Sequence, residues 1–251
     1  MMRRRFFVEK FEGQRAELRG EAAGHLGRVL RAEPGQLYEL TDGEQVWLAR
    51  VDKNSRGSKN GAAIEFVLVE QIPAVESALR VKLLLSIVKF DRMEWCLEKA
   101  TELGATEIIP LAAARSEKTL ILAAAKRASR WQKILIESAQ QSRRLRPPVL
   151  AEIAKVDDAF GSANESVKVL LSEHAGANPL REVVQGVSAK EICFAIGPEG
   201  GWTDAELASA AKCEFREASL GREILRTETA VIASLAIFRY ALDSSRNERQ
   251  H

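Results

Sequence analysis

The stretch Ile192-Cys193-Phe194-Ala195-Ile196-Gly197-Pro198-Glu199-Gly200-Gly201-Trp202-Thr203 is the part of the sequence that most directly indicates the fold. Its first five residues are apolar, which is typical of a strand buried on both faces of a parallel sheet. Thr203 stands three positions before Glu206, and this spacing predicts a helix capping box. The stretch therefore predicts an α/β fold with a ligand site at the glycine turn, because ligands bind at the carboxyl ends of parallel strands.

The same alternation of strands and helices extends on both sides of this stretch. Asp91 is expected to cap the helix that follows the first strand, and Gly104 is expected to end that helix in a left-handed conformation. Trp131, Leu135 and Ala139 share one helical face and are expected in the core. The predicted strands are 81–88, 107–111, 167–172 and 192–196, and the predicted helices are 92–103, 126–142, one from Thr203, and 229–242.

Residues 1 to about 70 have a different pattern, which indicates a small β-barrel or sandwich. Short strand-like runs at 37–40 and 45–51 flank Asp42-Gly43, a hairpin signal, and another apolar run covers 62–69. One helix is expected at 22–31. The segment 70–77 contains Pro73 and is the best candidate for a linker.

Composition limits the class of protein. The chain has 251 residues, of which 46% are hydrophobic and 29% charged, as in ordinary globular proteins. It shows neither an apolar run of about 20 residues nor a signal-peptide core, so no membrane association and a cytoplasmic location are expected. Its three cysteines are far apart and lack C-x-x-C spacing, which argues against disulfides and a metal site.

The net charge of +2 means that any affinity for nucleic acid must come from local clusters. One cluster is Arg3-Arg4-Arg5 beside Phe6 and Phe7. The other contains Arg143, Arg144 and Arg146. Either cluster is a candidate RNA contact, and the alternative is a solvated surface without a partner.

The glycine turn is neither a Walker A motif nor a G-x-G-x-x-G fingerprint, which argues against nucleotide hydrolysis and dinucleotide binding. Its glycines would let the backbone approach a ligand closely, although a tight turn without a ligand is the alternative. A second unusual stretch, residues 219–230, mixes charged and apolar residues just before the last predicted helix. Its charges must face solvent or serve a site, since unpaired charges are costly to bury.

Several separated motifs resemble one family. G-P-E-G-G at 197–201 and L-G-x-x-I-L-R-T-E-T-A at 220–230 occur together with K-A-T-E-L-G at 99–104 and Q-S-x-R at 141–144. With R-F-F at 5–7 and H-L-x-x-V-L-R at 25–31, the chain resembles the RsmE family of 16S ribosomal RNA uridine-N3 methyltransferases over nearly its whole length.

The resemblance implies a PUA-like RNA-binding β-barrel over residues 1–72 and a SPOUT methyltransferase domain over 73–247. The implied fold is α/β with a C-terminal trefoil knot, and knots are too rare for periodicity to predict one. It further implies a homodimer that uses S-adenosylmethionine, needs no metal, and acts on 16S ribosomal RNA, within the small ribosomal subunit.

Site residues follow from the same resemblance. Arg226 is the candidate for stabilising charge on the target base, and Glu199 is a weaker candidate for a general base. Either residue could instead hold the knot together. The residues expected around the cofactor are Leu171, Glu173, Ile196, Gly197, Gly200, Gly201, Ser219, Leu220, Gly221, Ile224, Leu225 and Thr229.

The residues expected to contact RNA are basic, with one aromatic: Arg4, Arg5, Phe6, Arg31, Lys89, Arg115 and Arg144. The chain departs from the family pattern at Arg143, where glycine is common, and at Gln140, where an acid is common. Two other functions stay open: a catalytically silent RNA-binding or ribosome assembly factor, and a SPOUT methyltransferase that acts on transfer RNA ribose.

Overall fold

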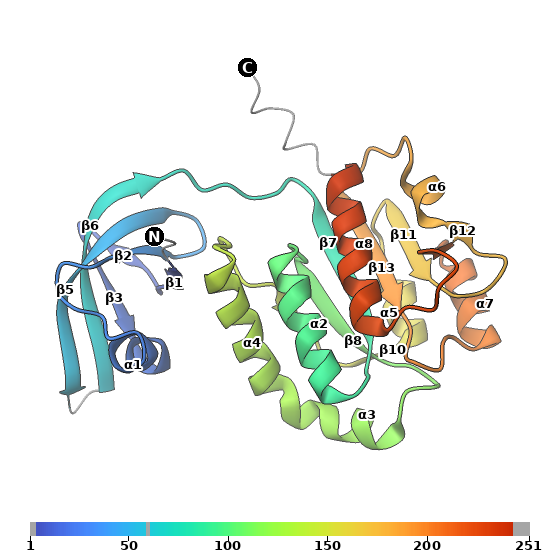
Figure 1. The fold of residues 1–251 in the computed structure, drawn as a ribbon, viewed down its shortest axis with the longest axis horizontal. Coiled ribbons are helices and arrows are strands. Elements are labelled where there is room, and N and C mark those ends of the chain that lie inside the picture. The colour runs from blue at the N-terminus through green and yellow to red at the C-terminus, as the bar shows by residue number, and fades with distance from the viewer. Residues whose placement is uncertain (1–3, 59–60, 243–251) are drawn as a thin grey trace. The chain divides into compact units, whose positions relative to one another are not determined.

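The structure is a computed structural model that describes residues 4–58 and 61–242 (Figure 1). The chain divides into two compact units. The first combines residues up to Glu76 with Ala139–Pro147, and the second combines Ser77–Ser138 with the residues from Pro148 onward. The predicted end of the methyltransferase domain, 243–247, lies outside the described residues.

The first unit is one curled mixed sheet with a single described helix. The strands run in the order β1-β4-β5-β6-β3-β2, and only β1 and β4 pair in parallel. The helix α1 (Gly20–Arg28) buries Ala23 and Leu26 against the sheet. The strands are β1 (Arg5–Phe7), β2 (Phe11–Glu12), β3 (Arg15–Arg19), β4 (Leu37–Thr41), β5 (Val46–Ser58) and β6 (Gly61–Ile72).

The predicted hairpin at Asp42-Gly43 is confirmed. It joins the antiparallel strands β4 and β5, and Gly43 has a φ of +93°, which glycine adopts without steric cost. The Asp42 carboxylate accepts the amides of Glu44 and Gln45, at 2.9 and 2.8 Å. The aspartate thus fixes the turn through its side chain, and the glycine does so through its backbone.

The second unit is an α/β domain built on a parallel sheet in the order β10-β8-β7-β13-β11-β14-β12, with β9 beside β8. This confirms the predicted fold class. The central strands β7 (Arg80–Ser86) and β13 (Glu191–Ile196) pair along six positions, from Arg80 with Glu191 to Leu85 with Ile196. The other strands are β8 (Glu107–Ala112), β9 (Val149–Leu150), β10 (Ala154–Lys155), β11 (Val167–Leu171), β12 (Asn178–Pro179) and β14 (Arg216–Ser219).

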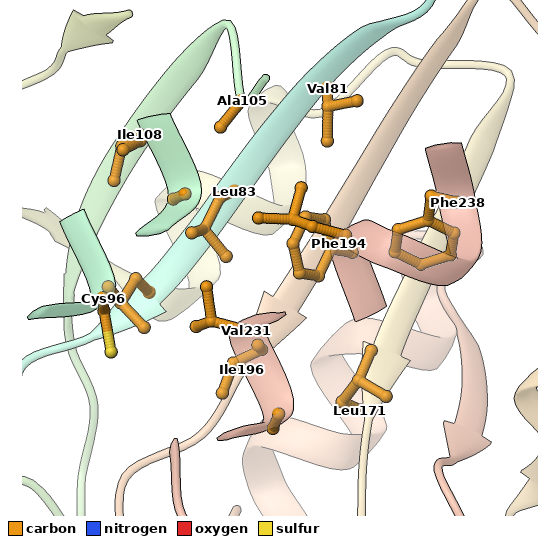
Figure 2. Packing of buried hydrophobic residues seen from close by; sticks show 14 of the residues in the cluster. Val81, Leu83, Cys96, Ala105, Ile108, Leu171, Phe194, Ile196, Val231 and Phe238 are labelled. Atoms are coloured by element: carbon orange, nitrogen blue, oxygen red, sulfur yellow. The ribbon is translucent and has the colours of Figure 1, made fainter. Parts of the chain in front are cut away.

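Helices cover both faces of this sheet, so side chains alternate between two hydrophobic clusters. On β13, Phe194 and Ile196 face one cluster, whereas Cys193 and Ala195 face the other. Figure 2 shows Phe194 beside Phe238, and their ring centroids lie 5.1 Å apart. Each fully buried large apolar side chain contributes about 1.5–3 kcal/mol to folding.

The helices of the second unit lie between these strands in the sequence. Those facing the cluster of Phe194 include α2 (Phe90–Glu102), α4 (Ala128–Gln141), α6 (Leu180–Val184) and α8 (Thr227–Leu242). Those facing the cluster of Cys193 are α5 (Val156–Ser162) and α7 (Asp204–Lys212). A short helix α3 (Lys118–Ala124) and a single 3₁₀ turn, η1 (Ala125–Arg127), precede α4.

Helix α2 begins earlier than the sequence suggests. Its N-cap is Lys89, without a side-chain cap, so the prediction that Asp91 caps it is wrong. Asp91 lies within the first turn, where its negative charge still favours the helix. The predicted left-handed end is confirmed, because Gly104 has a φ of +88°.

The last helix, α8, is only partly covered by its own chain. Val231, Leu235 and Phe238 are fully buried, as expected for a core helix. Tyr240, in contrast, is 87% exposed, and Ala236 is also exposed. The alternative that another subunit covers part of this helix therefore stays open.

Candidate functional site

A cavity of about 490 Å³ lies at the carboxyl ends of β11 and β13. Its walls include the glycine turn after β13 and the bend 220–227 that leads into α8. The sequence predicts a site from these two stretches, and the structure brings them together around one space. The volume falls within the range of about 300–1,000 Å³ that is typical of small-molecule sites.

The glycine turn is fixed by hydrogen bonds from its own residues and from the loop after β8. Gly201 has a φ of +68° and donates its amide to the Pro198 carbonyl at 2.8 Å. Thr203 and Glu206 form the predicted capping box, which is confirmed. The Glu206 carboxylate also accepts the Ala114 amide at 2.9 Å, so one buried acid fixes both the helix start and a neighbouring loop.

At two of the glycines an added side chain would crowd a neighbouring residue. A Cβ on Gly197 would lie 3.1 Å from the Trp202 indole, and a Cβ on Gly200 would lie 3.2 Å from the Arg115 Cβ. Arg115 also donates to the Gly200 carbonyl at 2.8 Å. Gly197 and Gly201 line the cavity, so the backbone of the turn can approach a ligand there closely.

The bend after β14 offers free backbone groups to the cavity. Gly221 has a φ of +151°, and Ile224 is 79% exposed. Among the described residues, Ile224 and Leu225 make no backbone hydrogen bond. Their amides and carbonyls can therefore bond the donors and acceptors on the edge of a heterocyclic base.

The charged side chains that line the cavity differ in whether they are paired with another residue. Arg226 and Glu173 line the cavity and are exposed. Glu199 also lines it, but one carboxylate oxygen accepts from the Arg92 guanidinium at 3.0 Å. Arg226 is thus the freer of the two predicted catalytic groups, while Glu199 is held toward helix α2.

A second cavity of about 350 Å³ adjoins the first and shares Arg115 and Glu199 with it. Lys89, Arg92 and Glu117 complete its charged lining. Its three cations outnumber its two carboxylates, which suits an anionic ligand. Lys89 and Arg115, both predicted to contact RNA, therefore lie beside the glycine turn.

Most of the predicted cofactor residues surround one space. Gly200 lines the second cavity, and Ser219 and Thr229 line neither. Sequence reasoning did not include His174 and Trp202 among the site residues, although both line the first cavity. The predicted residues that line it are Leu171, Glu173, Ile196, Gly197, Glu199, Gly201, Leu220, Gly221, Ile224, Leu225 and Arg226.

In the first unit, two of the predicted RNA contacts are corrected by their burial. Phe6 is 1% exposed and packs edge-on against Tyr38 at 5.7 Å, so it cannot stack on a base. Arg5 is 8% exposed and donates to the Glu39 carboxylate at 3.1 and 3.0 Å. The sequence showed a basic run but not the acid on the neighbouring strand that Arg5 pairs with.

The departure from the family pattern at Arg143 has a structural consequence. Arg143 has a φ of +55°, a conformation that glycine adopts at lower cost. Its carbonyl accepts from Arg5 at 2.6 Å, and its guanidinium lies 3.6 Å from Glu39. Arg143 thus adopts the positive φ of the turn, and it also contacts both members of the Arg5–Glu39 ion pair. Of the remaining predicted RNA contacts in this unit, Arg4 and Arg31 are exposed and Arg144 is half-buried.

Other chemistries find little support in the part of the chain that the structure describes. No group of three or more histidine, cysteine or acidic residues there could hold a metal ion. Burial, with the nearby Glu228 and Glu199 charges, raises the pKa of the Cys96 thiol to about 12, which makes it a poor nucleophile.

Within residues 4–58 and 61–242, no helix has the length and hydropathy needed to cross a membrane.

Comparison with known proteins identifies the class. A family model described as an RNA methyltransferase domain matches residues 75–239, which contain the parallel sheet and both cavities. Fold and site thus define an RNA methyltransferase. A ribosomal RNA small subunit methyltransferase E from Synechocystis is 34% identical over 224 residues, covering 88% of this chain and 71% of the relative.

Solved structures agree with this match. The ribosomal RNA small subunit methyltransferase E of Neisseria gonorrhoeae, bound to S-adenosylmethionine, is 32% identical, with a TM-score of 0.83 over 96% of this chain and 98% of that one. A Legionella pneumophila methyltransferase with bound S-adenosylmethionine is 31% identical, with a TM-score of 0.84 over the same shares. The chain belongs to the ribosomal RNA small subunit methyltransferase E family.

Proposed function

We propose that this protein transfers a methyl group from S-adenosylmethionine to N3 of one uridine in 16S ribosomal RNA. The observation that carries the proposal is the single cavity formed by the glycine turn and the bend before α8. Relatives whose structures superimpose over nearly the whole chain bind S-adenosylmethionine. The proposal therefore assigns this cavity to the methyl donor.

The residues present fit that donor. Gly197 and Gly201 line the cavity with their backbone, and the backbone groups of Ile224 and Leu225 make no backbone hydrogen bond among the described residues. Adenine suits such groups because its edge carries both acceptors and a donor. S-adenosylmethionine would supply an electrophilic methyl group whose thioether leaves without charge, so the protein mainly has to align the reacting atoms. Alignment can be worth about 7–11 kcal/mol.

The target base requires stabilisation of negative charge. Uridine N3 carries a proton at neutral pH, and removing it spreads charge onto O2 and O4. The exposed Arg226 guanidinium in the cavity stabilises that charge, and Glu199 is the candidate acceptor for the proton. Arg92 holds one Glu199 oxygen at 3.0 Å, which orients the carboxylate.

The RNA strand approaches through the second cavity in this proposal. Lys89 and Arg115 line that cavity and are exposed, so they suit the phosphate groups beside the target uridine. Arg4 and Arg31 are the proposed RNA contacts of the PUA-like first domain over residues 1–72, and Arg144 is a further proposed RNA contact. Arg5 and Phe6 support this domain from within.

The remaining expectations from the family resemblance form part of the same proposal. The methyltransferase domain spans residues 73–247 and contains a trefoil knot near its C-terminus. Two copies form a homodimer through the uncovered side of α8. The enzyme works in the cytoplasm, where its substrate is the ribosomal RNA of the small subunit.

The test is methylation of small ribosomal subunits from a strain that lacks this activity. Purified protein and isotope-labelled S-adenosylmethionine are mixed in separate reactions with naked 16S RNA, intact subunits or transfer RNA, and the digested nucleosides are analysed by mass spectrometry. Labelled 3-methyluridine supports the proposal. Label on a ribose of transfer RNA, or S-adenosylmethionine binding without transfer to any RNA, would refute it.

A further inference from the structure

Trp202 forms the floor of the first cavity. Its side chain is 6% exposed, yet it contributes to the cavity wall. A Cβ on Gly197 would lie 3.1 Å from the indole Cε2 and 3.2 Å from Nε1. The first residue of the glycine turn therefore rests directly on the indole.

The same indole also holds the end of strand β11. Its Nε1–H donates to the Leu171 carbonyl at 2.9 Å, in a buried position. Leu171 is the last residue of β11 and pairs with Ile196 on one side and Ala218 on the other. One side chain thus links the end of β11 with the turn that follows β13.

The position of the indole is fixed by an aromatic cluster on its far side. Its ring centroid lies 5.9 Å from that of Phe160, which in turn lies 4.7 Å from Phe215. These rings belong to the buried cluster beneath the sheet. The next residue, Thr203, is held by the capping box. The indole has little freedom to move away from the turn.

We infer that Trp202 is a positioning residue for the methyl donor. It acts through Leu171 and Gly197, both of which line the cavity, by fixing the separation between the end of β11 and the glycine turn. The inference rests on the proposed function, since it takes the ligand of this cavity to be S-adenosylmethionine.

The test compares Trp202→Phe with Phe215→Leu, using calorimetric titration with S-adenosylmethionine and thermal unfolding. Trp202→Phe keeps an aromatic ring but removes the N–H donor, so Kd should rise about tenfold while kcat at saturating S-adenosylmethionine changes less than threefold. Phe215→Leu disturbs the same cluster away from the cavity, so Tm should fall with Kd within twofold of the unsubstituted protein. Equal Kd values for the unsubstituted protein and Trp202→Phe would overturn the inference.

A second variant covers the case in which Trp202→Phe does not fold. Gly197→Ala adds a methyl group against the indole at a residue without positive φ, so it should lift the turn and raise Kd at least fivefold. An unchanged Kd would show that the turn does not rest on the indole. If the unsubstituted protein itself fails to bind S-adenosylmethionine, the proposed function is at fault, because both tests compare variants with a protein that binds.

Discussion

Arg226 is the residue on which the proposed chemistry depends most. It is exposed, lines the cavity and has no ion pair among the described residues, so its charge is available to a substrate. We expect Arg226→Ala to lower kcat by about 10²–10³-fold, as for the loss of a donor that stabilises developing charge. The Kd for S-adenosylmethionine should stay within threefold.

Single-turnover kinetics with saturating RNA and S-adenosylmethionine give this comparison. Arg222→Ala is the matched control, because Arg222 lines the same cavity on the same bend but carries no proposed role. Full turnover in Arg226→Ala would remove the residue from the mechanism.

The buried Cys96 thiol should make the stability of the protein depend on pH in the alkaline range. Burial raises the pKa of its thiol from an ordinary value of 9.0 to about 12, with a further contribution from Glu228. Because the folded pKa is raised, the stabilisation is fully present below pH 9.0 and is lost as pH rises toward 12. Between pH 9.0 and about 12, the free energy of unfolding of the unsubstituted protein should therefore fall by about 1.4 kcal/mol more per pH unit than that of Cys96→Ala.

Urea unfolding at several alkaline pH values measures these slopes. The buried Cys193, whose pKa is also raised by burial, is present in both proteins and cancels in the comparison. Parallel pH profiles for the two proteins would contradict the assignment of a buried neutral thiol to Cys96.

The sequence predicted which residues line the cavity better than it predicted which basic residues are exposed. The sequence suggested Gly197, Leu225 and Arg226 as neighbours, and they line one cavity. It could not show that Glu39, on the strand beside β1, neutralises Arg5, because pairing between strands 34 residues apart depends on the register. It also could not show that Trp202 lies beneath the turn, since the next buried aromatic neighbour, Phe160, comes from a distant helix.

At the scale of elements, Arg239 connects the last helix to two other segments. Its guanidinium donates to the carbonyls of Leu103 and Leu79, at 3.1 and 3.2 Å, and also to Ser77 and the Gly104 carbonyl. These groups belong to the end of α2 and to the chain that enters β7. A single side chain therefore holds α8 against both.

We expect Arg239→Met to lower the free energy of unfolding by about 2–4 kcal/mol. Methionine keeps much of the apolar stem but leaves three part-buried carbonyls without the arginine donor. Arg181→Met is the control, because Arg181 is exposed and should change stability by less than about 0.5 kcal/mol. Equal losses in the two variants, measured by urea unfolding, would show that Arg239 does not join the segments.

Strands and helices could be told apart in the sequence because the spacing of apolar residues follows which positions are buried. Strand β13 and the capping box of α7 follow the sequence closely. The start of α2 was not predictable from its cap, since the helix begins at Phe90 without a side-chain cap. The first residue, Phe90, instead packs against Trp131, with ring centroids 6.0 Å apart, a contact that depends on the tertiary fold.

At the level of the whole molecule, the exposed side of α8 is the proposed interface of the homodimer. Tyr240 is 87% exposed near the end of a mostly apolar helix, and Ala236, which is also exposed, lies one turn before it. A charged residue there should disrupt an interface without affecting the core. We expect the unsubstituted protein to sediment as a dimer, whereas Tyr240→Glu should sediment as a monomer at the same concentration.

Analytical ultracentrifugation distinguishes the two cases. Tyr38→Glu is not a suitable control, because Tyr38 packs on Phe6 and Phe66. Val75→Glu is preferable, since Val75 is 63% exposed and lies outside α8. If both variants and the unsubstituted protein sediment alike, α8 does not form the interface.

The division into a curled sheet and a parallel sheet was predictable from the change in pattern near residue 70. The sequence did not predict that residues 139–147, the end of helix α4 and the loop after it, join the first unit. The Arg146 Nε–H donates to the Gly43 carbonyl at 2.5 Å, so this return depends on a contact between segments about 100 residues apart. Local patterns contain no information about such contacts.

A crystal structure of this protein grown with S-adenosylmethionine tests whether the cavity binds the methyl donor. We expect electron density for the donor between Gly197–Gly201 and Leu220–Leu225, with adenine bonded to the backbone of Ile224 or Leu225. Density for the donor at any other place, with this cavity filled only by solvent, would contradict this expectation.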